Sequence, residues 1–556
     1  MATLSRVFSP AGLTLAATLQ STLAIKLLPS YYGSQNNLSS AAVIFLANYA
    51  MGVFFWAVIY PVLLSPLRHI PGPREVVSVG RRSLTVKEGA GGDLFADVVR
   101  KYPGQPLISL NTFRDQLMIA DPALLPEILV HRCYDFTKPR KTRVFLRRVL
   151  GEGLVVAEGE QHKFLRKHSI PAFNFRHVRN LYPMMWDKAE LLTTVLRKEI
   201  AGGDRNTDNA DPSVVELSSW ASKITLDIMG VACLGRNINA AEKSSDPLQK
   251  TYEAILEPTR EKILYAVLFF VFGPTFLRLL PWRMHRIFEQ LTGTLDSICA
   301  QLVQDKRREL STEKESGEER GEHYDILSLL IKSSNFTDAV LKDQLLTFLA
   351  AGRHETTASS LTWACYLLAK HPDLQTKLRE EMTENLPEHP GQCSQGDLAI
   401  LLEQLPYLNG VIHETLRLYP TVPLTAREAI CDTRLGDQFV PKGTMMAISI
   451  WQINRSPEFW GPSPTEFRPE RWMESNGKPN QTGGMSSNYH FMTFSHGPRS
   501  CIGQGFAKAE MRCLLAAMIR SFSWELAMDE SKTAPRGIIT IKPEHGLNLK
   551  LTPLCS

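Results

Sequence analysis

One cysteine is the residue best placed to do chemistry. Cys501 lies in "FMTFSHGPRSCIGQGF", residues 491–506, just before a segment with helical periodicity. The free N–H groups at a helix N-terminus favour a thiolate. Gly497 and Gly503 permit tight turns and the close approach of a flat partner, and Arg499 offers a charge suited to a carboxylate. A single thiolate on such a loop suits axial ligation of haem iron, with the arginine meeting a haem propionate.

Spacing alone leaves other interpretations of Cys501 open. A structural thiol in the core is as plausible, since free cysteines are commonly buried. A nucleophile would need a histidine base, and His496 is close in sequence, although nothing indicates that it reaches the sulfur. Zinc would need three or four clustered ligands, and none are near Cys501 in the sequence.

A second motif is the charged pair in "HETLR". Glu414 and Arg417 are three residues apart and therefore share one face of a helix. The surrounding segment is apolar, so the pair would be buried, and a buried charge must be paired and hydrogen-bonded. An ordinary helix salt bridge would look the same in the sequence. The pair becomes more informative because "FRPERW", with Arg471, follows further along the chain.

The stretch from Phe494 to Gly503 resembles the haem-binding signature of the cytochrome P-450 family, Phe-x-x-Gly-x-Arg-x-Cys-x-Gly, at all five fixed positions. Other motifs that resemble the family occur in the expected order, namely "GEQHKFLRK", "AGRHETT", "HETLR" and "FRPERW". The resemblance covers residues 70–550 and is closest to membrane-anchored fungal members. It implies a mainly α fold with small β-sheets, and haem b whose iron is ligated by the Cys501 thiolate.

The resemblance also implies which residues hold the haem. Phe494, Gly503 and Arg499 belong to the signature itself. His162 stands where the family usually has tryptophan, and because histidine also offers an N–H donor, propionate contact through His162 and Arg166 would survive the change. Arg427 is a weaker propionate candidate. By the same resemblance, Arg471 completes the network of Glu414 and Arg417.

Glu355 and Thr356 in "AGRHETT" are the catalytic candidates, because a hydroxyl beside a carboxylate can relay protons. The family pattern would place glycine at position 353, where this chain has Arg353. Either the arginine replaces that glycine, or one extra residue is absorbed as a π-bulge. We favour a kinked or bulged helix, since desolvating a lone arginine is costly.

The implied function is a monooxygenase that inserts one atom of O2 into a lipophilic small molecule, such as a fungal secondary metabolite of the terpenoid, polyketide or alkaloid class. The chain contains no flavin or nicotinamide fingerprint, so family analogy indicates a separate NADPH–cytochrome P-450 reductase. Basic residues are candidates for its docking site: Arg140, Lys141, Arg143, Arg147, Arg148, Lys163, Arg166 and Lys167. The alternatives are an isomerase or dehydratase that does not use O2, which Thr356 argues against, and a non-catalytic membrane haem sensor.

Composition limits the other classes of function. The 556 residues carry a net charge of only +5, and no RNA- or DNA-binding motif occurs, so the sequence gives no case for nucleic-acid binding. The nine cysteines are spread singly, without a CxxC pair. That pattern is not a disulfide framework and indicates a reducing compartment.

The N-terminal region predicts a membrane anchor over residues 1–70, followed by a catalytic domain over 71–556. Residues 40–66 carry no charge, and 41–65 is the best candidate for a span, since about 20 apolar residues cross a bilayer. Residues 11–28 are a weaker second candidate. Arginines at 68, 74, 81 and 82 follow directly, so the positive-inside rule places the catalytic domain in the cytosol, with the anchor in the endoplasmic reticulum membrane.

The body of the chain is predicted to be mostly helical. Residues 340–372 form one long buried helix, 372–386 an amphipathic surface helix, and 402–420 contain a buried helix that ends at Pro420. The pattern of residues 432–450 indicates strand, Gly-Asp turn and strand. The charged run 305–322 and the Gly/Asn/Ser-rich run 475–488 are predicted to be exposed loops. The apolar run 263–272 is too short to span a bilayer and either dips into it or belongs to the core.

Overall fold

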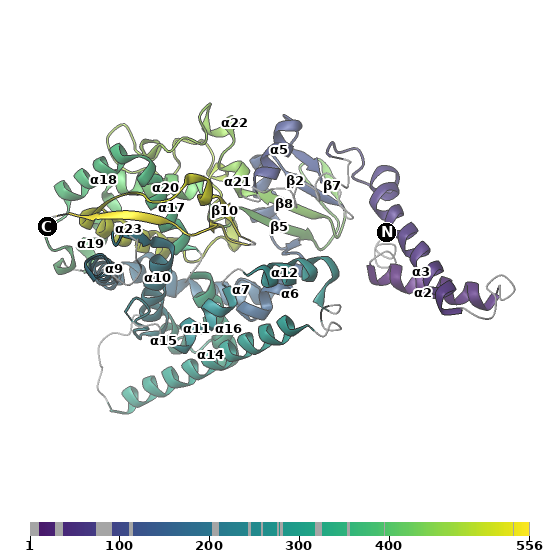
Figure 1. Cartoon of the computed structure of the whole chain (residues 1–556), viewed down its shortest axis with the longest axis horizontal. Coiled ribbons are helices and arrows are strands. Elements are labelled where there is room, and N and C mark those ends of the chain that lie inside the picture. The colour runs from purple at the N-terminus through teal and green to yellow at the C-terminus, as the bar shows by residue number, and fades with distance from the viewer. Residues whose placement is uncertain are drawn as a thin grey trace. The chain divides into compact units, whose positions relative to one another are not determined.

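The computed structural model describes residues 10–27, 37–73, 92–110, 115–202, 211–242, 246–256, 259–274, 277, 282–316, 325–352, 356–393, 395–537 and 539–554. The chain divides into two compact units, each built from several segments. The first unit contains Met1–Lys87, Leu94–Thr137 and Ala426–Ser449. The second contains Glu88–Asp93, Lys138–Thr425 and Ile450–Ser556. Helices dominate, and the sheets are small (Figure 1).

The first unit contains a five-stranded sheet with strand order β1-β2-β8-β5-β3. Its strands are β1 (Leu107–Ser109), β2 (Gln116–Ile119), β8 (Met445–Ser449), β5 (Leu424–Ala429) and β3 (Phe136–Thr137). The segments of β2 and β8 are apolar, and they pair in parallel with Met118 opposite Ala447. Both side chains belong to a buried apolar cluster that also contains Val98 of α5 (Asp93–Lys101). This cluster is a core of the first unit. The predicted strand–turn–strand is confirmed as β6 (Thr433–Leu435) and β7 (Gln438–Val440).

The N-terminal segment of the first unit is helical but changes its type of helix. The α-helices α2 (Pro10–Leu27) and α3 (Asn37–Phe54) lie side by side, and the π-helix η1 (Phe55–Leu64) continues α3. In the described part of the chain, no helix combines the length and the apolar character needed to cross a membrane. The span predicted over 41–65 is therefore not supported, because that apolar run is divided between α3 and η1.

The end of this apolar segment is tied to the sheet of the same unit. Tyr60 donates its phenolic hydrogen to Asp115 at 2.8 Å, and the hydroxyl of Ser65 donates to the other carboxylate oxygen at 2.6 Å. Asp115 directly precedes β2. The chain around residue 65 is thus fixed to the body of the first unit by polar contacts.

The second unit is built around buried helices: α10 (Leu217–Leu234), α17 (Thr357–Lys370), α20 (Pro406–Leu418) and α23 (Gln504–Ser521). In α20 every residue from Tyr407 to Leu418 is buried, as predicted for that segment. The amphipathic helix predicted over 372–386 is confirmed as α18 (Pro372–Asn385).

Other α-helices of the second unit surround these: α6 (Arg140–Leu150), α7 (Gly159–Ser169), α8 (Phe175–Asn180), α9 (Tyr182–Gly202), α11 (Pro247–Leu256), α12 (Arg260–Phe272), α14 (Arg283–Ser316), α15 (Ile326–Lys332), α16 (Asp338–Gly352), α19 (Gln395–Gln404), α21 (Ile450–Ile453) and α22 (Pro457–Trp460). A three-stranded sheet has the order β4 (Val214–Glu216), β12 (Asn548–Pro553), β9 (Phe522–Leu526), and β10 (Pro535–Arg536) pairs with β11 (Lys542–Pro543).

Two expectations about secondary structure were wrong. The charged run 305–322 is helical as far as Ser316, because α14 continues through it as the long helix at the bottom of Figure 1. Its charges pair within the helix, as Lys306 does with Glu309. The single long helix predicted over 340–372 consists of two helices, α16 and α17. The loop predicted over 475–488 is confirmed as turns with one isolated β-bridge.

Candidate active site

The Cys501 loop is a series of tight turns that ends at a helix. Ser495 and Gly497 have φ of +56° and +75°, in the left-handed region that glycine adopts without strain. The backbone N–H of Cys501 donates to the carbonyl of Phe494 at 2.9 Å, which closes the loop. The helix α23 begins at Gln504 with Gly503 as its N-cap, so Cys501 precedes a helix N-terminus as predicted.

The side chain of Cys501 is exposed, yet much protein lies around it. Partial desolvation raises the pKa of its thiol, whereas the backbone N–H of Gly503 and the positive charge of Arg166 act to lower it. The pKa of the thiol is raised on balance, and the donor and the cation offset part of the cost of its anionic form. These properties fit an axial ligand of a large planar group.

Two arginines flank the cysteine and have different partners. Arg499 is paired with Glu158, and their side chains are only 4% and 9% exposed. Arg166 donates from Nη1 to the carbonyl of Ser500 at 2.6 Å and from Nη2 to the Ser500 hydroxyl at 3.3 Å. The structure therefore brings Arg499 and Arg166, both predicted from the sequence, to the Cys501 loop.

Glu158 is a site residue that the sequence reasoning missed. It is the N-cap of α7, and its Oε1 accepts a hydrogen bond from the backbone N–H of Lys138 at 2.8 Å. The Lys138 ammonium lies 3.7 Å from the same oxygen. The only signal in the sequence was an acidic residue directly before "GEQHKFLRK", and such a residue is common at a helix N-terminus for capping alone.

His162 is buried on α7, one turn after Glu158. Burial lowers the pKa of its imidazole to about 4, and the positive charges of Arg499 and Lys138 add to the effect, while Glu158 opposes it. The ring is therefore neutral at pH 7 and carries one N–H donor. The Nε2 atom of His496 lies 2.8 Å from the backbone oxygen of Asn488.

Thr356 lies between α16 and α17. Its hydroxyl donates to the carbonyl of Ala351, five residues earlier, at 2.9 Å. The backbone oxygen of Thr356 accepts from the hydroxyl of Ser360 at 2.9 Å and from that of Thr421 at 3.4 Å. Thr356 is the N-cap of α17, and Arg353 and Glu355, which belong to the same prediction, lie outside the described residues.

Arg427, the remaining haem-binding candidate, belongs to the first unit. It is buried on β5, and its Nη1 donates to the carbonyl of Ala426 at 2.9 Å. Phe494 is partly buried against the core of the second unit, and the ammonium of Lys508 lies 5.7 Å from the centre of its ring.

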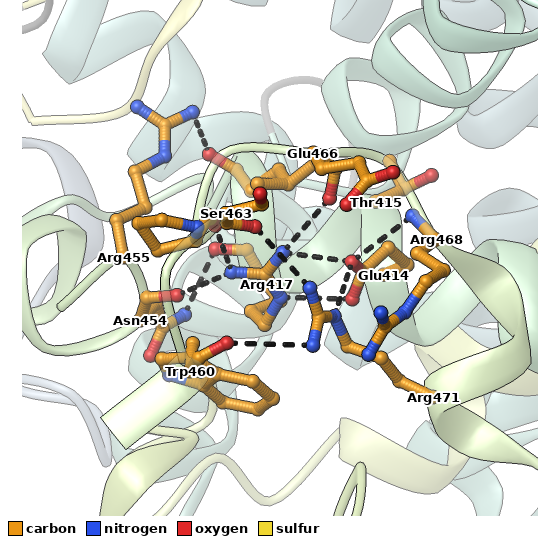
Figure 2. A network of polar contacts seen from close by, with 12 residues as sticks. Glu414, Thr415, Arg417, Asn454, Arg455, Trp460, Ser463, Glu466, Arg468 and Arg471 are labelled. Atoms are coloured by element: carbon orange, nitrogen blue, oxygen red, sulfur yellow. Dashed lines mark hydrogen bonds and ion pairs between the residues drawn. The ribbon is translucent and has the colours of Figure 1, made fainter. Parts of the chain in front are cut away.

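The structure joins Glu414, Arg417 and Arg471 in one buried network (Figure 2). Arg417 binds Glu414 in a bidentate manner, with Nη2–Oε1 and Nε–Oε2 distances of 2.7 and 2.8 Å. Nε of Arg471 lies 3.2 Å from Oε1 of Glu414. Glu414 and Arg417 are completely buried, and a buried ion pair persists only when its remaining polar atoms are also satisfied.

Further partners in this network were not predicted. The indole N–H of Trp472 donates to Oε2 of Glu414 at 2.9 Å, and Nη1 of Arg417 donates to the carbonyls of Asn454 and Pro464 at 2.8 and 2.6 Å. These contacts join α20 to the irregular segment before the Cys501 loop. Sequence spacing could not reveal them, because backbone carbonyls carry no residue signature.

Comparison with known proteins gives the class of this chain. A sequence model of the Cytochrome P450 family matches residues 71–549. The cytochrome P450 monooxygenase sphH of Aspergillus fumigatus is 39% identical over 533 residues, which cover 94% of both chains. The cytochrome P450 monooxygenase FUM15 of Gibberella moniliformis is 35% identical and covers 90% of this chain and 91% of its own length. The cytochrome P450 monooxygenase ptmK of Penicillium ochrochloron is 34% identical, with 91% and 97% covered.

The chain therefore belongs to the cytochrome P450 family. It is an oxidoreductase of the monooxygenase type, and the cofactor of the family is haem bound through a cysteine thiolate. The accessible thiol of Cys501, the two arginines beside it and the neutral imidazole of His162 fit such a cofactor. When bound, the haem supplies oxygen activation and electron transfer, and the protein supplies orientation and protons.

Proposed function

We propose that this monooxygenase oxidises a lipophilic small molecule of fungal secondary metabolism, of the terpenoid, polyketide or alkaloid class, with electrons from a separate NADPH–cytochrome P-450 reductase. The observation that carries the haem chemistry is the accessible Cys501 thiol at the N-terminus of α23, with Arg166 beside it. The similarity to fungal monooxygenases supports the reaction type. For the substrate, the support is the apolar pair Val422 and Leu424 in the "TVPLT" segment.

Each residue of the site has a defined task in this proposal. Cys501 binds the iron, and Phe494 and Gly503 shape its loop. Arg499, Arg166 and His162 bind the propionates. The guanidinium of Arg499 is oriented for this by Glu158, and the neutral imidazole of His162 donates one N–H.

Proton delivery is assigned to Thr356 and Glu355. The hydroxyl of Thr356 can donate a proton to the oxygen that is activated at the haem. It can then accept a proton in turn, because a hydroxyl has one donor and two acceptor positions. In the structure this hydroxyl donates to the carbonyl of Ala351. A carboxylate next to it, that of Glu355, can return the proton from solvent.

The reductase would dock on basic side chains of α6 and α7. Four of these side chains are exposed, namely Arg140, Arg147, Lys163 and Lys167, and the other four are half-buried. An acidic partner would be drawn to such a surface, and the attraction would weaken with ionic strength. Of the half-buried residues, Arg148 donates to Tyr265 at 2.7 Å and Lys141 to the carbonyl of Phe270 at 2.6 Å, while the exposed Arg147 and Lys163 pair with Glu152 and Glu160.

We also propose that the N-terminal helices attach the enzyme to the endoplasmic reticulum membrane, with the rest of the chain in the cytosol. Large apolar side chains are exposed along α2, α3 and η1, and exposed apolar patches mark membrane or protein contacts: Leu19, Leu23, Val43, Leu46, Met51, Phe54, Leu63 and Leu64. The arginines that follow the segment favour the cytosolic side.

The decisive test is the substitution Cys501→Ser. We expect it to abolish the absorption band that the thiolate gives to the reduced, CO-bound protein, because a serine hydroxyl is not a thiolate ligand at neutral pH. Cys513→Ser is the matched control, since that thiol is buried on α23, the helix that follows the Cys501 loop. A Cys501→Ser protein that keeps the band would show that another cysteine binds the iron.

The substrate class has its own test. Lipophilic terpenoids, polyketides and alkaloids are added in turn to the haem-loaded enzyme, and a shift of the haem absorption band reports binding. NADPH consumption with the reductase then shows whether the bound compound is oxidised. An isomerase, a dehydratase or a sensor would bind ligand without consuming NADPH.

A further inference from the structure

Four aromatic side chains of the second unit form a continuous series of contacts. Trp363 stacks on Tyr419 with ring centroids 4.1 Å apart and an interplanar angle of 11°. Tyr366 lies 5.6 Å from Trp363 and 6.1 Å from Tyr419, and Trp451 lies 6.1 Å from Tyr419. Trp363, Tyr366 and Trp451 are at most 5% exposed. Tryptophan and tyrosine are among the side chains that lose one electron most readily, and the resulting radical stays on the aromatic ring.

The inner end of this aromatic series is joined to the oxygen-activation segment. Trp363 follows Thr356 by seven residues. This separation is about two helical turns, which places the two residues on the same side of the helix and roughly 10 Å apart along its axis. The second connection runs through Thr421, two residues after Tyr419. Its hydroxyl lies 3.1 Å from that of Ser360 and 3.4 Å from the carbonyl of Thr356.

The outer end reaches solvent through a carboxylate. The phenolic hydroxyl of Tyr366 donates to Oε1 of Glu530 at 3.0 Å, and the Glu530 side chain is 57% exposed. Lys370 binds the same oxygen. This contact lowers the pKa of Glu530, while burial raises the pKa of Tyr366. At neutral pH an ionised carboxylate therefore faces a protonated phenol, which is the arrangement needed for loss of an electron and a proton together.

Nearby charges differ between Trp451 and Tyr366, the two rings at the ends of the series. The guanidinium of Arg455 lies 3.2 Å from the ring centroid of Trp451 and 5.2 Å from that of Tyr419. A cation against a ring opposes removal of an electron from that ring. At Tyr366 the ammonium of Lys370 lies 5.7 Å from the ring centroid, and its charge is offset by Glu530. An electron vacancy is therefore most stable at Tyr366.

We propose that Trp363, Tyr419 and Tyr366 carry oxidising equivalents away from the active site when activated oxygen meets no substrate. One electron leaves Tyr366 and passes through Trp363, on which Tyr419 is stacked, to the oxidant at the haem site, which is reduced by one electron. The O–H bond of Tyr366 breaks, its proton passes to Glu530, and a neutral tyrosyl radical remains. A small thiol or ascorbate then returns the electron and is itself oxidised by one electron, and the proton returns from Glu530 to Tyr366. The proposal rests on the proposed haem chemistry of Cys501.

The test uses the full-length, haem-loaded enzyme without substrate. It is mixed with hydrogen peroxide and frozen within the first turnover, and radicals are observed by electron paramagnetic resonance. We expect a tyrosyl signal in the wild type, loss of that signal in Tyr366→Phe, and a reduced yield in Glu530→Gln. Haem bleaching during the same reaction is expected to be several-fold faster in Tyr366→Phe. Both substitutions nearly preserve the size of the side chain. Glu530 also lies at the surface, so its replacement should not disturb the fold.

Tyr407→Phe is the matched control. Tyr407 is also a buried tyrosine, and Lys377 lies 5.9 Å from its ring, much as Lys370 does at Tyr366. Its variant should give the wild-type signal and the wild-type rate of bleaching. A wild-type tyrosyl signal in Tyr366→Phe would overturn the proposal. Failure of the haem chemistry itself is distinguishable, because the wild type would then lack the CO band and consume no peroxide.

Discussion

The Arg499–Glu158 pair shows how single residues set the electrostatics around Cys501. Both side chains are nearly buried, and removing one partner of a buried ion pair leaves an uncompensated charge that costs about 3 to 5 kcal/mol. A haem propionate next to Arg499 would replace part of the lost interaction. Glu158 therefore acts as a positioning residue for the arginine and as a fixed negative charge near the proposed iron site.

Substituting Glu158→Gln should raise the reduction potential of the haem, because removing a nearby negative charge makes the addition of an electron easier. Haem retention should also fall, since Arg499 is no longer held in place. Glu160→Gln is the matched control on the same helix, where Glu160 is 87% exposed and pairs with Lys163 at 2.6 Å. Potentials are measured by spectroelectrochemical titration. Equal potentials for the two variants would contradict a role for Glu158.

At the scale of elements, α23 carries a buried acid whose ionisation works against the fold. Burial raises the pKa of Glu510 to about 8, and Thr357 offsets part of the effect. The pKa of Glu510 is higher in the folded than in the unfolded protein. The contribution of this group to the free energy of unfolding is therefore greatest below about pH 4.5 and is lost as the pH rises toward 8. Every tenfold difference between the folded and unfolded acid dissociation constants corresponds to roughly 1.4 kcal/mol of stability.

The substitution Glu510→Gln removes this dependence. The melting temperature of the variant relative to the wild type should rise steadily between about pH 5 and pH 8, because only the wild type must ionise a buried carboxyl group. Glu525→Gln, on the exposed side of β9, should show a constant difference over the same range. Melting is followed by calorimetry of the haem-loaded enzyme. A parallel course of the Glu510→Gln and wild-type curves would show that Glu510 is not buried as a neutral acid.

The sequence predicted those elements whose pattern is local. The buried helix α20 and the hairpin β6–β7 follow from apolar runs bounded by Pro420 and by a Gly-Asp turn. The helical part of 305–322 was missed because its stability depends partly on Lys306, which is 6% exposed and lies 3.3 Å from Asp325 on a different element. In the candidate site, signature residues were predictable, whereas Glu158 and Trp472 were not, since their partners are distant in sequence.

At the scale of the whole molecule, two apolar surfaces could contact a membrane. One lies on the N-terminal helices, where Val43, Leu46 and Met51 are 63–66% exposed. The other lies on α12, where Ile263, Leu264 and Val267 are 43–50% exposed, while Tyr265 and Phe269 on the same helix are buried. The buried residues show that α12 is held by the core of its unit. The helix α3 has no comparable row of fully buried side chains among its described residues.

This difference predicts which surface attaches the protein to membranes. Replacing Val43, Leu46 and Met51 together with serine should release the enzyme from endoplasmic reticulum vesicles, because each large apolar side chain contributes about 1.5 to 3 kcal/mol when it leaves water. The matched control replaces Ile263, Leu264 and Val267 with serine and should leave attachment intact. Vesicle flotation measures the bound fraction, and the CO band verifies folding of both proteins. Release by the α12 substitutions alone would assign membrane attachment to the catalytic part of the chain instead.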